Sequence, residues 1–118
     1  MITIEQLKEI QQRADKLKQY LAIDEKRVQL EEEELRTQDP GFWEDAKAAE
    51  AQMRKVKGIK AWIEGYEGVR SATEELQLAF DYCKEELVTE DEVDAAYAHA
   101  VKEVEALEMK NMLSHEED

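Results

Sequence analysis

Turn-forming and disulfide-forming residues are scarce in this sequence of 118 residues. It contains one proline, one cysteine and four glycines. β-Sandwiches, barrels and βαβ folds need frequent turn residues, so this composition disfavours them and favours long helices. The single cysteine, Cys83, excludes an internal disulfide framework and is typical of a protein in a reducing cytosol.

Long apolar runs are also missing. No run approaches the roughly 20 residues that a membrane-spanning helix requires. The first residues, "MITIEQLKEI", lack the basic region and apolar block of a secretory signal peptide. We therefore expect a cytoplasmic protein without a membrane partner, and the length predicts a single helical domain over residues 1–118.

Positive charge is scarce in the second half of the chain. The net charge is −14. Residues 1–60 carry 12 Lys/Arg and 13 Asp/Glu, whereas residues 61–118 carry 4 and 17. Because nucleic-acid affinity depends on cationic contacts to phosphates, a general RNA- or DNA-binding role is disfavoured. A protein partner with a basic face fits better, although such charge also serves simply to keep exposed helices soluble.

The first helical tract opens with Thr3 and Gln6, which have the spacing of a capping box. Apolar residues then alternate at spacings of three and four, the a/d stripe of a helix that packs along another helix. This stripe consists of Leu7, Ile10, Ala14, Leu17 and Leu21. A second, rotated stripe consists of Tyr20, Ile23 and Leu30. We predict one helix over about residues 4–36, with a register shift near residues 22–25.

Residues 35–53, "LRTQDPGFWEDAKAAEAQM", interrupt the helical pattern with the only proline and two adjacent aromatics. Residues 39–41 supply a capping side chain, a helix-breaking proline and a flexible glycine. A hairpin of two long helices needs a large apolar group at its corner, so we expect Phe42 and Trp43 to be buried there. The alternative is that they stack on a ligand, but no Gly-rich loop or basic cluster lies beside them.

The second tract covers about residues 44–87 and keeps helical spacing nearly throughout. Its apolar stripe consists of Ala46, Ala49, Met53, Val56, Ile59, Ile63, Tyr66, Val69, Thr73, Leu76, Phe80, Cys83 and Leu87. Gly58, Gly65 and Gly68 each cost about 1 kcal/mol relative to Ala in a helix. They indicate either a bend or break near residues 58–68, or positions where another helix approaches closely.

The third tract covers about residues 90–113 and starts with a second capping box, Thr89 with Glu92. Its stripe consists of Val93, Tyr97, Ala100, Val104, Leu107 and Asn111. Helices joined by short connections run antiparallel to one another. The predicted fold is therefore all-α, an elongated antiparallel three-helix bundle with coiled-coil character.

No motif for catalysis or cofactor binding occurs. Phosphate-binding glycine loops are absent, and His99 and His115 are isolated rather than spaced as zinc ligands. Cys83 lies on the apolar stripe without a neighbouring His or Arg, so we interpret it as a buried structural cysteine. We expect no catalytic residue, no metal, no cofactor and no enzymatic activity.

Two acidic runs come nearest to a metal-binding motif. The first is "EEEE" at residues 31–34, with no His or third ligand near it in sequence. We interpret it as a solvated helix end. The second is "SHEED" at residues 114–118, which we interpret as a solvated tail.

The interrupting segment has a counterpart in a known family. "DPGFWEDAKAAEAQM" closely resembles the D-P-x-F-W-[DN]-[DE] segment of the bacterial peptide chain release factor 2 family. "QYLAIDEKRVQLEEEELRTQ" is similar to its Y-L-D-x-D-x-K-x-x-x-L-x-x-L-E region, and "EVEALEMKNMLSHEED" to its L-E-x-x-x-M-L-S-G-E-x-D run. Ala22 stands where this family usually has Asp, and His115 where it usually has Gly.

The resemblance implies the N-terminal helical domain of a translation termination factor that directs peptidyl-tRNA release at UGA and UAA stop codons. The family's S-P-F tripeptide, which selects stop codons, and its G-G-Q loop, which promotes hydrolysis, are absent from the sequence. Contacts with the mRNA stop codon and peptidyl-tRNA would therefore belong to domains that this chain lacks.

The role that the resemblance implies for this chain is docking. The implied partners are proteins of the ribosome's stalk base and GTPase-associated centre, and the release-factor GTPase that recycles the factor. Helical periodicity alone would equally support a free-standing coiled-coil adaptor or scaffold, so both functions remain open at this point.

Overall fold

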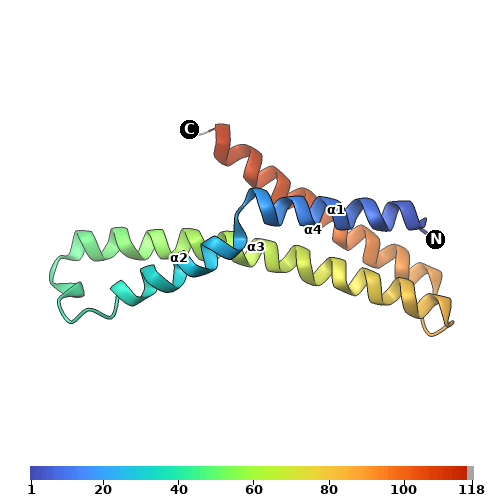
Figure 1. Cartoon of the computed structure of the whole chain (residues 1–118), viewed down its shortest axis with the longest axis horizontal. Coiled ribbons are helices and arrows are strands. Elements are labelled where there is room, and N and C mark those ends of the chain that lie inside the picture. Colours follow the sequence, from blue (N-terminus) through green and yellow to red (C-terminus); the bar gives the residue numbers. More distant parts are fainter. Residues whose placement is uncertain (117–118) are drawn as a thin grey trace. The chain divides into compact units, whose positions relative to one another are not determined.

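A computed structural model of the chain describes residues 1–116, in which four α-helices and one short 3-10 helix follow one another (Figure 1). They are α1 (Ile4–Tyr20), α2 (Ile23–Arg36), η1 (Phe42–Glu44), α3 (Ala46–Lys84) and α4 (Glu90–Glu116). These residues contain no strand, so the predicted all-α class is confirmed. They form two compact units, residues 22–64 and the remainder of the chain, and α3 contributes to both.

Both predicted capping boxes are present. The backbone N–H of Gln6 donates to Thr3 Oγ1 at 3.1 Å, and the backbone N–H of Thr3 donates to Gln6 Oε1 at 2.9 Å. At the start of α4 the corresponding distances between Glu92 and Thr89 are 3.2 and 2.8 Å. Each box satisfies two backbone groups that a bare helix end would leave without partners.

The prediction of one helix over residues 4–36 is wrong, because the helix ends at Tyr20 and α2 starts at Ile23. Ala22 has φ 49° and ψ 53°, the left-handed conformation. Leu21 is 4% exposed and Ile23 0%. In a continuous helix these two side chains would point about 200° apart. The left-handed residue ends the first helix where the register shift was predicted, and it lies at the boundary between the two units.

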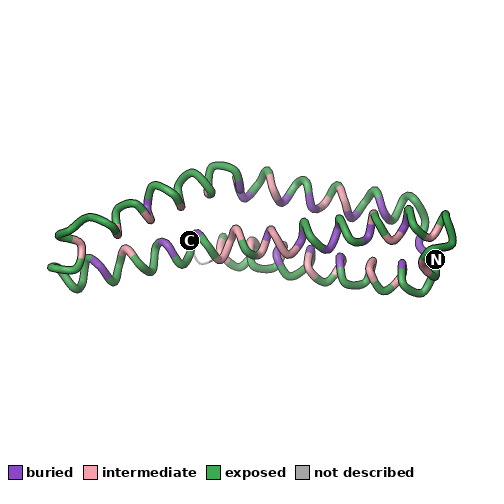
Figure 2. The backbone as a smooth tube through the Cα atoms, turned by 90° about the horizontal axis from the view of Figure 1, so that it is seen from below, coloured by how far each residue is buried: buried purple, intermediate pink, exposed green. Residues whose placement is uncertain are grey.

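The first unit buries apolar side chains from α1, α4 and the second half of α3, which lie side by side (Figures 1 and 2). The a/d stripe of the first tract, from Leu7 to Leu21, is buried throughout, whereas Tyr20 of the rotated second stripe is exposed. From α3 and α4 the buried side chains include Tyr66, Val69, Leu76, Phe80, Val93, Ala100, Val104 and Leu107. Polar contacts connect the same helices, since Gln11 Nε2 donates to Gln77 Oε1 at 2.6 Å.

α3 is continuous from Ala46 to Lys84, so of the two alternatives for its glycines a break near residues 58–68 is excluded. Two of the three glycines instead face α4 closely. A Cβ added at Gly65 would lie 3.0 Å from Leu107 Cδ1, and one at Gly68 would lie 3.0 Å from Glu103 Oε2. At Gly58 an added Cβ would meet nothing within 4 Å. Close helix approach therefore explains Gly65 and Gly68, but not Gly58.

α3 ends three residues earlier than the predicted Leu87. The N–H of Leu87 donates to the Tyr82 carbonyl and that of Glu86 to the Cys83 carbonyl, both at 3.0 Å, and Glu86 has φ 60°. This is a Schellman motif, in which one left-handed residue closes the helix. Because a glutamate rather than a glycine holds that position, no sequence signal marked the end, and Leu87 is exposed instead of lying on the stripe.

The second unit is a hairpin of α2 and the first half of α3. Its buried apolar side chains are Ile23, Ala49, Val56 and Ile59. Four large apolar side chains are exposed, namely Val28, Leu35, Trp43 and Met53. A two-helix hairpin offers little interior, so this unit leaves much of its apolar surface accessible to solvent.

The predicted boundaries at residues 4, 36 and 90 are confirmed, and two further boundaries differ by two and three residues. α3 starts at Ala46 rather than Glu44, and α4 continues to Glu116 rather than residue 113. Residues 114–116 of the predicted solvated tail are therefore helical, while residues 117 and 118 lie outside the described residues.

Candidate docking surface

The connection between α2 and α3 is a structured turn. Asp39 Oδ1 accepts from the backbone N–H of Gly41 at 3.3 Å, and Phe42 N–H donates to the Asp39 carbonyl at 2.9 Å. The 3-10 helix η1 follows, and Asp45 then caps α3 by accepting from Ala48 N–H at 3.1 Å. Sequence reasoning assigned capping to Asp39 and missed Asp45, although an Asp just before a helical run is a capping signal.

The prediction that Phe42 and Trp43 fill the corner is wrong for Trp43, which is 68% exposed. Phe42 is half-buried. Their rings meet edge to face, with centroids 4.7 Å apart and planes at 66°. Adjacent residues in a 3-10 helix point about 120° apart, so both cannot face the same interior. We call the exposed turn of residues 39–45 the aromatic tip.

A buried carboxylate helps to hold the hairpin instead. Glu33 on α2 has a side chain that is only 7% exposed. Its Oε2 accepts from Gln52 Nε2 on α3 at 2.7 Å, and its Oε1 lies 3.2 Å from Lys55 Nζ. Gln52 Nε2 also donates to the Glu33 carbonyl at 2.9 Å. The interpretation of residues 31–34 as a solvated helix end is therefore wrong at Glu33.

The surroundings of Glu33 favour its ionised form. The hydrogen bond from Gln52 and the cations of Lys55 and Arg36 lower the pKa of Glu33 below its ordinary value of 4.5, against the opposing effect of desolvation. A paired, hydrogen-bonded carboxylate of this kind acts as a structural contact between two helices.

Three of the five basic residues of α3 in the second unit have glutamate partners. Arg54 Nη1 lies 3.0 Å from Glu50 Oε1, Lys55 contacts Glu33, and Lys60 Nζ lies 3.6 Å from Glu34 Oε2. This run, residues 54–60, was the part of the chain best suited to phosphate. Its pairing with glutamates reduces the positive field available to RNA.

A shallow groove of about 330 Å³ lies beside the aromatic tip in the second unit. It is lined by Arg36, Asp39, Gly41, Phe42, Ala48, Ala49 and Gln52. Two alanines and the Phe42 ring supply apolar surface, while Asp39 and Arg36 supply charges of opposite sign. This combination suits one apolar side chain and a charged neighbour.

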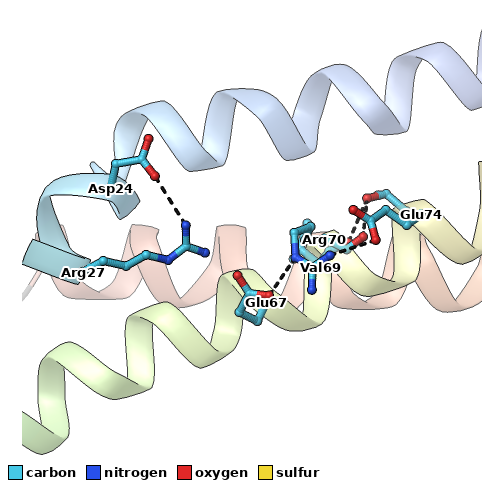
Figure 3. A network of polar contacts seen from close by, with 7 residues as sticks. Asp24, Arg27, Glu67, Val69, Arg70 and Glu74 are labelled. Atoms are coloured by element: carbon cyan, nitrogen blue, oxygen red, sulfur yellow. Dashed lines mark hydrogen bonds and ion pairs between the residues drawn. The ribbon is translucent and has the colours of Figure 1, made fainter. Parts of the chain in front are cut away.

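The first unit carries most of the negative charge, and its arginines are held by glutamates. Arg70 lies between Glu67 and Glu74 at 2.7 and 2.8 Å (Figure 3), and Arg13 Nη2 lies 2.6 Å from Glu108 Oε1. These hydrogen bonds raise the pKa of both arginines, so they stay charged. A groove of about 450 Å³ passes Arg70, and among its lining side chains Gln11 donates to Gln77 and Arg70 donates to Glu74.

The remaining candidate residues do not assemble into a chemical site. Cys83 is half-buried rather than fully buried. His99 and His115 are both exposed. Within residues 1–116, no group of three or more His, Cys, Asp or Glu side chains could hold a metal ion.

The part of the chain that the structure describes has no helix with both the length and the apolar character needed to cross a membrane.

Curated proteins match this chain over almost its full length. Peptide chain release factor 2 of Pseudoalteromonas translucida is 30% identical over 98% of the chain. The same factor of Burkholderia pseudomallei is 30% identical over 95%, and that of Nitratiruptor sp. is 29% identical over 97%. The chain is a relative of peptide chain release factor 2. It spans about a third of the length of these relatives. No protein-family model matches it.

Proposed function

We propose that this chain is the ribosome-docking domain of a peptide chain release factor 2, acting in translation termination in the cytoplasm. The observation that carries the proposal is its match over 95–98% of its own length to release factor 2 relatives of which it spans about a third. A free-standing adaptor has no comparable support.

The chemistry of termination would belong to other parts of such a factor. The S-P-F and G-G-Q motifs that the family uses at UGA and UAA codons do not occur in this sequence. We therefore propose that the chain alone is not an enzyme. Incubating it with ribosomes that carry a stop codon and peptidyl-tRNA should release no peptide. Release at the rate of a complete factor would contradict this.

We further propose that docking uses proteins of the stalk base and GTPase-associated centre, and the recycling GTPase. The acidic first unit and the basic run of α3, in which three of four cations pair with glutamates, both support protein partners over RNA. We also propose that α1, α3 and α4 of the first unit form an antiparallel three-helix bundle with coiled-coil character.

The decisive experiment measures binding of a labelled chain to large ribosomal subunits, with subunits lacking the stalk-base proteins as control. Binding should require those proteins and weaken as ionic strength rises. Equal binding to subunits stripped of them would refute the partner assignment. A charge-reversal variant of Glu74, Glu75, Glu85 and Glu86 to Lys should slow association, because acidic side chains would then no longer steer it.

A further inference from the structure

Trp43 has the most exposed aromatic side chain of the second unit and contributes little to the packing of the fold. The one aromatic ring contact of Trp43 within residues 1–116 is with Phe42, and 68% of the residue is accessible. Asp39 and Asp45 hold the backbone on either side through hydrogen bonds. Trp43 is thus a large apolar side chain presented on an ordered turn, the kind of residue that dominates the energy of protein interfaces.

The groove beside the aromatic tip is lined by Asp39, whose carboxylate can accept further hydrogen bonds. Asp39 uses Oδ1 for a single contact with Gly41 N–H, at 3.3 Å, while an ionised carboxylate has about four acceptor positions. Arg36 on the groove wall lies 3.7 Å from Glu33, a carboxylate that it shares with Lys55, and this pairing reduces its repulsion of a second cation. An incoming guanidinium could therefore bond to Asp39 bidentately.

Local charge selects the class of partner. Between residues 39 and 50 the chain carries four acids and one base, namely Asp39, Glu44, Asp45, Glu50 and Lys47. This field repels phosphates and attracts basic groups. Of the aromatic side chains tryptophan binds cations best, and arginine is the cation most often found on it. Trp43 lies edge to face with Phe42, which lines the groove together with Asp39. An indole face and a carboxylate near one groove suit an arginine, and the groove suits an apolar residue next to that arginine.

We propose that the aromatic tip binds an exposed arginine of a basic protein partner, with an apolar neighbour of that arginine entering the groove. The inference rests on the proposed function in that the partner would be one of the chain's docking targets. Beyond docking itself, the inference specifies that the contact surface is the aromatic tip of the second unit rather than the acidic first unit, and that the group it recognises is an arginine side chain.

A direct test measures the fluorescence anisotropy of short labelled peptides mixed with the whole chain. One peptide alternates arginine with leucine, one alternates glutamate with leucine, and a single-stranded RNA oligonucleotide replaces them in the third arm. The arginine peptide should bind, and Trp43→Ala should weaken its binding by about two- to fivefold or more. Asp39→Asn should also weaken it. Tyr20→Ala removes a ring from the first unit that is 75% exposed, and should have no effect.

Three results would overturn the inference: no binding of the arginine peptide, equal binding by Trp43→Ala, or equally tight binding of the RNA. Thermal melts of every variant establish that each is folded.

A second measurement separates this inference from the proposed function. Affinity of the chain for large ribosomal subunits should fall at least tenfold in Trp43→Ala and stay unchanged in Tyr20→Ala. If the unaltered chain binds subunits and Trp43→Ala binds them equally well, docking stands and the aromatic tip does not carry it. If no subunit or recycling GTPase binds the chain, yet the arginine peptide binds through Trp43, docking fails and the tip's specificity stands.

Discussion

Replacing Ala22 with glycine should stabilise the protein, because Ala22 has a positive φ without being a glycine. The left-handed conformation costs an alanine roughly 1–2 kcal/mol. Glycine adopts it freely but loses about 0.4–1 kcal/mol more conformational entropy on folding. The balance for Ala22→Gly is a gain of about 0.5–1 kcal/mol in the free energy of unfolding. Ala22→Asp should gain less, since Asp enters this conformation more readily than Ala but less readily than Gly.

Urea unfolding followed by circular dichroism at 222 nm measures these differences through the transition midpoint. Ala98→Gly is the matched control, because Ala98 is an exposed residue within α4. The same change there should destabilise the protein by about 1 kcal/mol. Because both variants replace alanine with glycine, opposite changes in the free energy of unfolding would identify the backbone conformation of residue 22 as the cause. If Ala22→Gly lowers the midpoint as Ala98→Gly does, residue 22 is not left-handed in solution.

Three further outcomes can be measured on the same instrument. Gly58→Ala should raise the free energy of unfolding by up to about 1 kcal/mol. Gly65→Ala should raise it less or lower it, because the added Cβ would meet Leu107 at 3.0 Å. Equal increases in the two variants would contradict the close approach of α4 to Gly65. Trp43→Ala should change stability by no more than about 0.5 kcal/mol, as surface substitutions do, and a loss of 3 kcal/mol would restore the buried corner. The folded pKa of Glu33 lies below 4.5, so the ionised side chain contributes its full stabilisation above that pH and loses it as pH falls through the folded pKa. Glu33→Gln should therefore flatten the acid limb of a curve of unfolding free energy against pH. An unchanged limb would show that Glu33 is not paired in solution.

Sequence patterns identified the parts of the fold that rest on repeated local signals. The stripe from Leu7 to Leu21 and both capping boxes are present as predicted, because each depends on residues three or four positions apart in one helix. The two left-handed residues, Ala22 and Glu86, were not foreseen. Glycine or asparagine usually marks such positions, and neither is present here. The coiled-coil character of the packing stays a prediction.

The candidate surface was harder to predict because burial there depends on contacts between α2 and α3. Four consecutive glutamates look alike in sequence, but the inward face of α2 selects Glu33 alone for burial, opposite Gln52 and Lys55. The pattern of hydrophobic and polar residues in a sequence does not reveal a polar side chain that is buried because it bonds to other polar groups.

Sequence patterns predicted an exposed Glu33 and a buried Trp43, and the structure shows the opposite for both residues. The corner was expected to need a buried aromatic pair, yet Glu33, Gln52 and Lys55 connect α2 and α3 through hydrogen bonds and an ion pair. A hairpin held by that network does not require Trp43 for its closure. Phe42 remains half-buried and supports the neighbouring ring edge to face, so the indole is ordered without being used. An apolar side chain that the fold does not bury is available for binding. Because the charged residues around Trp43 are mostly acidic, a basic protein is its suitable partner.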